Sequence, residues 1–167
     1  MTKRVERASA RKRGPRPYAR KYESAPREIY RVYRLICHWL YRRGDVAAAR
    51  QLCGTFEALL DERPVSNTAF FRHFELAVLR EAQGDIERAI AHRWKAIKLI
   101  RAGFVHVQRT RDDVLRASLI RLLRSQARES FKHLDRLYRA SGRVAAAKQA
   151  SKESARVLEE LKYKRTP

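Results

Sequence analysis

Apolar residues recur at intervals of three and four along most of the chain, from about residue 24 to residue 163. This spacing places them on one face of an α-helix. Ile29, Tyr33, Ile36, Cys37 and Leu40 follow it in the first such segment, and polar residues fill the positions between them. The pattern therefore predicts amphipathic helices that pack with their apolar faces together.

Glycines and capping residues divide this pattern into about six helices. The predicted ranges are about 26–43, 45–62, 66–84, 85–103, 110–140 and 142–163. Gly44, Gly84 and Gly142 mark tight turns, because glycine readily adopts the left-handed conformation that ends many helices. Residues 104–110 (FVHVQRT) alternate in polarity and are predicted to be an extended connector. Thr110 and Asp113 have capping-box spacing at the start of the next helix.

The first and third turns have almost identical sequences, GDVAAARQL from Gly44 and GRVAAAKQA from Gly142. Five positions after each turn glycine stands an alanine: Ala49, Ala89 and Ala147. A small side chain at this position lets the second helix of a hairpin approach the first closely. The repeated turn is therefore predicted to serve packing rather than binding.

Residues 76–99 (LAVLREAQGDIERAIAHRWKAIKL) resemble a tetratricopeptide-type helical hairpin. The matching positions are Leu76, Ala77, Gly84, Asp85, Ala89 and Ala96. His73 and Arg80 replace the usual aromatic residues, and the turn glycines are 40 and 58 residues apart, where the family keeps about 34. The resemblance implies an all-α fold in which three helical hairpins form a tetratricopeptide-like stack over about residues 26–163. Such repeats present surfaces to partners.

Two LYR triplets, Leu40–Arg42 and Leu137–Arg139, resemble the motif of small mitochondrial LYR adaptor proteins. In that family the helix continues beyond the triplet, whereas both triplets here lie one turn before a helix-ending glycine. Val32–Arg34 is better placed but has valine in place of leucine. This second resemblance is therefore set aside.

Charge changes the picture more than any motif does. The chain of 167 residues has 39 Lys and Arg against 18 Asp and Glu, a formal net charge of +21. Its hydrophobic share of 44% is ordinary for a globular protein, so it is not a disordered polycation. A charge this one-sided repels itself and needs counter-anions, of which nucleic acid is the commonest polymer.

Six basic residues of the helix predicted for 110–140 lie within an arc of about 120°, opposite Leu123, Ala127 and Leu134. They are Arg121, Arg124, Arg128, Lys132, Arg136 and Arg139. Like charges four residues apart cost about 0.2–0.5 kcal/mol per pair, and a bound polyanion would remove this cost. Arg27, Arg31, Arg34 and Arg42, with His38, form a similar row on the first helix. The alternative is that both rows are merely solvated helix faces.

Residues 1–25 are predicted to be a basic, extended N-terminal tail, and residues 164–167 a short C-terminal tail. Gly14, Pro15 and Pro17 break any helix in the first of these. Its candidate RNA-binding residues are Lys3, Arg4, Arg7, Arg11, Lys12, Arg13, Arg16, Arg20 and Lys21. The composition also suits a mitochondrial transit peptide, so the mitochondrial matrix is favoured over the cytoplasm. A tail that only increases solubility is the other interpretation.

No metal-ligand spacing, phosphate-binding loop or nucleophile motif occurs, and the acids form no evident catalytic pair. We therefore expect no enzyme activity, no cofactor, no metal and no small-molecule substrate. No apolar run approaches eighteen residues, so no membrane partner is expected. Cys37 and Cys53, without CxxC spacing, indicate a reducing intracellular compartment, and whether they meet is left open.

These observations predict an RNA-binding structural subunit of a large ribonucleoprotein. A ribosome fits best, and the transit-like tail favours a mitochondrial one. The expected partners are ribosomal RNA and neighbouring proteins. The basic rows and the tail would contact phosphates. The alternative is a tetratricopeptide-like adaptor that grips an acidic protein.

Overall fold

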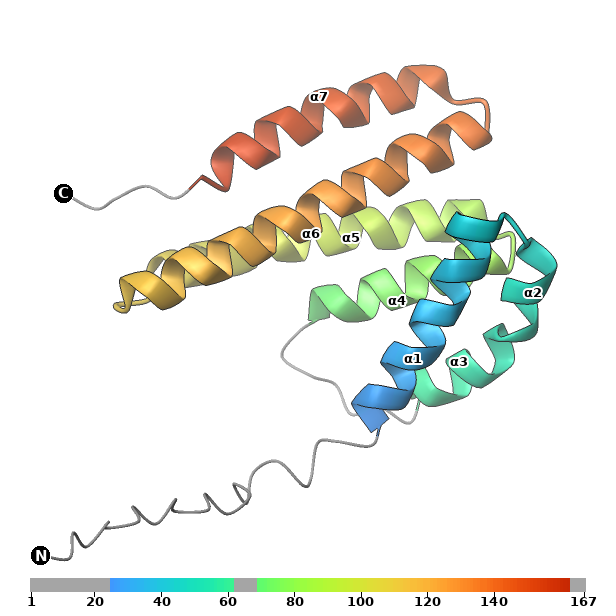
Figure 1. Ribbon diagram of the computed structural model, residues 1–167. Coiled ribbons are helices and arrows are strands. Elements are labelled where there is room, and N and C mark those ends of the chain that lie inside the picture. Colours follow the sequence, from blue (N-terminus) through green and yellow to red (C-terminus); the bar gives the residue numbers. More distant parts are fainter. Residues whose placement is uncertain (1–24, 62–68, 163–167) are drawn as a thin grey trace, which may run out of the picture.

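The computed structural model describes residues 25–61 and 69–162, and all regular secondary structure in these ranges is helical (Figure 1). The elements are α1 (Ala25–Cys37), the π-helical turn η1 (His38–Arg43), α2 (Val46–Gln51), α3 (Cys53–Asp61), α4 (Ala69–Ala82), α5 (Ile86–Gln108), α6 (Asp113–Ala140) and α7 (Val144–Glu160). Because η1 continues α1, and only Leu52 separates α2 from α3, these elements make six helical rods. The all-α prediction is confirmed. The predicted tails fall outside the described residues, except for Ala25, the first residue of α1.

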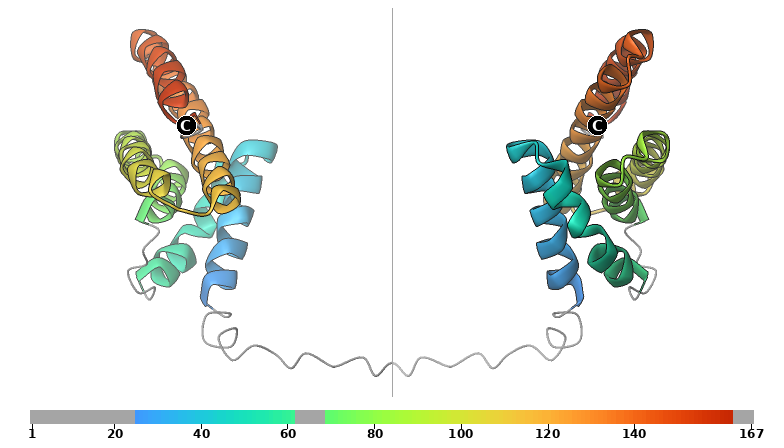
Figure 2. Two further views of the ribbon diagram at one scale, coloured as in Figure 1. Left: turned by 90° about the vertical axis from the view of Figure 1, so that its left-hand side faces the viewer. Right: turned by 90° about the vertical axis from the view of Figure 1, so that its right-hand side faces the viewer.

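The rods pair into three hairpins in chain order, α1–η1 with α2–α3, then α4 with α5, then α6 with α7 (Figures 1 and 2). α5 packs against both α4 and α6, and α7 packs against α6. α1 crosses α4 on the side that faces the viewer in Figure 1. The first hairpin and α6 thus lie on the same side of the α4–α5 pair.

Glycine makes the three turns for the predicted reason. The backbone φ angles of Gly44, Gly84 and Gly142 are 69°, 85° and 75°, in the left-handed region that L-residues avoid. At Gly84 and Gly142 the two backbone bonds of a Schellman motif close the preceding helix. The Asp45 and Asp85 side chains then cap the next helix by accepting a hydrogen bond from its backbone. At the third turn Arg143 holds this position, and its side chain makes no capping hydrogen bond.

The alanines five positions after the turn glycines are fully buried, as predicted. Ala49, Ala89 and Ala147 each have 0% of their surface exposed. A larger side chain at any of them would push the two helices of its hairpin apart. The repeated sequence at the turns therefore specifies close helix packing.

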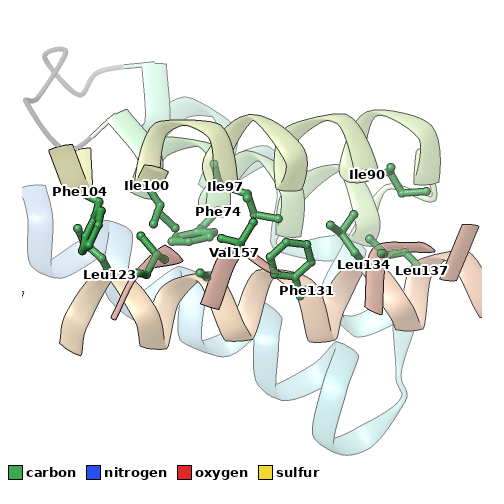
Figure 3. Packing of buried hydrophobic residues seen from close by; sticks show 14 of the residues in the cluster. Phe74, Ile90, Ile97, Ile100, Phe104, Leu123, Phe131, Leu134, Leu137 and Val157 are labelled. Atoms are coloured by element: carbon green, nitrogen blue, oxygen red, sulfur yellow. The ribbon is translucent and has the colours of Figure 1, made fainter. Parts of the chain in front are cut away.

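Two apolar cores hold the hairpins together, and α4 takes part in both. Phe74 belongs to a core shared with α5, α6 and α7, in which Ile97, Phe131 and Val157 converge (Figure 3). Val78 and other residues of α4 instead pack against α1, α2 and α3. α4 therefore fixes the first hairpin relative to the other two.

The extended connector predicted for residues 104–110 is wrong, because α5 runs through Gly103 to Gln108. Phe104 continues the buried face of the helix and lies beside Leu123 of α6 (Figure 3), and Val107 packs on the same core. The predicted Thr110 cap is also wrong. Asp112 caps α6 by accepting hydrogen bonds from the backbone N–H groups of Val114 and Leu115.

The second predicted helix is interrupted rather than continuous. α2 ends at Gln51, and the Leu52 N–H donates to Ala49 O, three residues back, in a tightened turn before α3. As for membranes, none of the described helices combines the length and the apolar character that a membrane span requires.

Two glycine substitutions test this description, and they should change the free energy of unfolding in opposite directions. Gly142→Ala should lower the free energy of unfolding by about 1–2 kcal/mol, because alanine is strained in the left-handed region. Gly103→Ala should raise it by about 0.5–1 kcal/mol, because Gly103 lies inside α5 and an added Cβ meets no atom within 4 Å. Urea unfolding followed by circular dichroism at 222 nm measures both. A Gly103→Ala protein less stable than the wild type would contradict the continuous α5.

Candidate nucleic-acid interface

Three basic side chains of α6 lie exposed along one line of the helix. Arg128 and Lys132 lie about 20° to either side of the direction of Arg121, and the three span about 16 Å along the axis. In the part of the chain that the structure describes, none of them forms an ion pair, and Arg121 only donates to the hydroxyl of Ser118 at 3.3 Å. We call these three residues the α6 row.

The other three predicted members of this face differ. Arg136 forms an ion pair with Glu81 of α4, and Arg139 with Asp135, at 2.8 Å. Arg124 is half-buried, and its Nε lies buried without a hydrogen-bond acceptor. Arg136 therefore differs from the α6 row, because its charge is already paired inside the protein. The predicted RNA contacts of all six residues stay a prediction. A carboxylate distant in sequence gives no signal in a helical pattern.

Glu81 joins three elements that the sequence separates. It is only 8% exposed, and it accepts a hydrogen bond from the Tyr41 hydroxyl at 2.8 Å as well as the charge of Arg136. The guanidinium of Arg136 also lies over the Tyr41 ring, 4.3 Å from its centroid. We call Tyr41, Glu81 and Arg136 the Glu81 clamp, since it ties η1 to α4 and α6.

His133 packs beside this clamp in its neutral form. Its ring centroid is 4.7 Å from that of Tyr41, and its Nδ1 is 3.3 Å from Nη2 of Arg136, which can only donate. Burial, together with the positive charges of Arg93, Arg136 and Lys132, lowers the pKa of His133 to about 2. An imidazole that must accept a hydrogen bond from arginine cannot also hold a proton at that nitrogen.

Arg93 of α5 lies behind the clamp, in the interior. It is 2% exposed, and its Nε and Nη2 have no hydrogen-bond acceptor among the described residues. Its guanidinium lies 5.7 Å from the ring centroid of Phe74. Neither its burial nor its position was predicted, because a single arginine on a helix normally points to solvent.

The two cysteines are both free thiols, which settles the disulfide question left open by the sequence. Cys53 is buried, and burial raises its pKa. Burial likewise raises the pKa of Cys37 to about 11, so its thiol is protonated at neutral pH. Both side chains act as small packing residues.

The arginine row predicted on the first helix is exposed. Arg27, Arg31, Arg34 and Arg42 all lie on the surface, opposite the buried Ile29 and Ile36. α1 and α6 both lie in front of the α4–α5 pair in Figure 1, and their buried faces turn towards the cores behind them. The exposed faces of α1 and α6 therefore point to the same side of the protein. The nine predicted basic residues between Lys3 and Lys21 fall outside the described residues.

One pair of histidines was not predicted from the sequence, because its members come from different helices. His73 of α4 and His92 of α5 have their Nδ1 atoms 3.0 Å apart, with the rings stacked. Burial and neighbouring positive charges lower the pKa of His73 to about 4. No group of three or more potential metal ligands occurs within the described ranges.

Comparison with known proteins adds no relative to this picture. No family model, no curated protein and no solved structure matches the chain. The tetratricopeptide resemblance therefore stays a prediction.

Removing the charge of Glu81 should loosen the first hairpin. We expect Glu81→Gln to lower the free energy of unfolding by about 2–4 kcal/mol, since it breaks a nearly buried ion pair, and Tyr41→Phe by about 1 kcal/mol. Asp135→Asn, which breaks the exposed pair with Arg139, is the matched control and should change it by less than about 1 kcal/mol. Urea titration measures all three. Equal effects of the Glu81 and Asp135 substitutions would show that the clamp has no special role.

Acid should destabilise the protein through His133. Its pKa is lowered on folding, so the unfolded chain takes up the proton first as pH falls below about 6.5, and stability is lost in this range. Between pH 7.5 and pH 5 we expect His133 to contribute a loss of about 1–2 kcal/mol, in addition to the losses from His73 and His92, whose pKa values are lowered in the same direction, and His133→Gln should remove this share. Unfolding titrations at both pH values compare the two proteins. An unchanged pH dependence in the variant would rule out this assignment.

Proposed function

We propose that this protein binds RNA as a structural subunit of a large ribonucleoprotein particle. The observation that carries the proposal is the α6 row, three exposed cations that form no ion pair among the described residues, on the same side as the arginines of α1. An extended polyanion can contact both helices at once. The row contains no acid within its arc other than Asp135, which is paired with Arg139.

The chemistry of the rows suits phosphate. Arg121, Arg128 and Arg31 carry planar guanidinium groups, which bind phosphate oxygens through two parallel hydrogen bonds. Spacings of four and seven residues place successive cations of α6 about 6 Å and 10 Å apart along one line. Such a line follows a nucleic-acid backbone and carries no base-specific information by itself.

A particle rich in RNA would also neutralise the remaining charge. A net charge of +21 is more than the two rows contain, so contact on several sides of the body is needed to balance it. A ribosome provides such surroundings, and the transit-like composition of residues 1–22 favours a mitochondrial one. Both the particle and the compartment are part of the proposal.

Charge reversal on α6 tests RNA binding directly. We expect Arg121→Glu, Arg128→Glu and Lys132→Glu together to weaken binding to a fluorescent RNA duplex at least about tenfold at 100 mM salt. The slope of log affinity against log salt should fall by about 2–3, because three phosphate contacts are lost. Fluorescence anisotropy over a salt series measures both quantities.

Lys95→Glu with Lys98→Glu is a control, because both lysines are exposed on α5 and point away from its core. These two reversals should have a clearly smaller effect per reversed charge. Equal losses per reversed charge in the two proteins would show that only net charge matters, and a flat salt profile in the wild type would end the proposal. Loss of an acidic protein partner in the α6 variant, with RNA binding intact, would favour the adaptor alternative.

A further inference from the structure

Tyr30 is an aromatic residue on the surface of α1 among arginines. Its side chain is 60% exposed, and it is the one aromatic among the large exposed apolar residues of the described chain. Tyr30, Arg31, Arg34, Leu35 and His38 line a shallow surface pocket. Leu35, at its other edge, is 40% exposed. A planar ligand stacked on the exposed ring would bury its apolar face.

Tyr30 lies on the side of α1 that turns towards α6. Tyr30 and Cys37 are seven residues apart on this regular helix, so their directions differ by only about 20°. Cys37 lies beside the Glu81 clamp, since the charges of both Glu81 and Arg136 act on its pKa. α1 approaches α6 near the clamp and diverges from it towards its own N-terminus (Figure 1). Tyr30, in the second turn of α1, therefore lies towards the end of the helix that is farther from α6.

Two planar groups meet at this pocket. The guanidinium of Arg34 lies over the Tyr30 ring, 5.8 Å from its centroid, within the range of a cation–π contact. Tyrosine rings and guanidinium planes are the groups on which unpaired bases stack in proteins that bind single-stranded RNA. The α6 row consists of two arginines and a lysine and includes no aromatic ring.

We propose that Tyr30 and Arg34 form a stacking site for one unpaired nucleobase of the bound RNA. The inference rests on the proposed RNA-binding function and names its substrate class, an RNA in which an unpaired nucleotide adjoins a double-helical segment. The double helix lies on the α6 row. The unpaired base enters the pocket on α1, where Arg31 contacts its phosphate.

Charge selects this occupant over an apolar one. Arg31 and Arg34 are exposed and form no ion pair within the described part of the chain, so an apolar peptide docked on Leu35 would remove both charges from water without compensation. A nucleotide supplies a π-face for Tyr30 and a phosphate for the arginines together. The pocket thus matches a base with its phosphate.

The test compares two RNA hairpins that differ only in one bulged adenosine, each titrated with the full-length protein by fluorescence anisotropy. The wild type should prefer the bulged hairpin by about 5- to 150-fold, the range for one stacked base. Tyr30→Ala should lose this preference while binding the unbulged hairpin as the wild type does, and Tyr30→Phe should keep it. Leu122→Ala, at an exposed apolar position of α6, is the matched control and should also keep it.

A second readout reports stacking itself. With 2-aminopurine in place of the bulged adenosine, the wild type and Tyr30→Phe should quench its fluorescence, and Tyr30→Ala should not. Equal affinity of the wild type for both hairpins, or a preference that survives Tyr30→Ala, would overturn the stacking site alone. Absence of salt-dependent binding to either hairpin would overturn the proposed function, and the stacking site with it.

Discussion

The arrangement of the basic surface depends on one nearly buried carboxylate. Glu81 receives the Tyr41 hydroxyl and the Arg136 charge, and so fixes the end of α1 against α6. The apolar core between α1 and α4 orients the first hairpin, but it leaves α1 and α6 in contact only near the clamp. Without this contact only the packing of α4 in both cores would position the first hairpin relative to α6, and the end of α1 would not be held directly against α6.

Several acids of the body lie where helices meet. Glu57 pairs with Arg80 across α3 and α4, Glu87 with Arg143 across α5 and the third turn, and Glu160 with Arg101 across α7 and α5. Such pairs hold neighbouring helices, while the α6 row, Arg31 and Arg34 form no ion pair in the described part of the chain. The arginines that pair with acids inside the protein are thus different from those that we propose to bind RNA.

Local signals made most of the fold predictable, and long-range contacts made the rest unpredictable. Glycine at three turns, followed by a buried alanine five residues later, specified the hairpins correctly. Gly103 looked like a helix end, yet packing of Phe104 and Val107 overrode its low helix propensity. Arg128 and Arg136 are equivalent in the helical pattern of α6, and only the folded chain shows that Glu81 engages the second.

The π-helical turn η1 allows one continuous helix to present arginines on the surface and Tyr41 to Glu81. With the regular 100° per residue, Tyr41 would lie at the edge of the basic face, only about 20° beyond Arg34. A π turn, closed here by the Gly44 N–H on Trp39 O five residues back, advances fewer degrees per residue and carries Tyr41 round towards α6. A chain lacking one residue between His38 and Arg43 would retain an equally basic composition, but its tyrosine would no longer face Glu81.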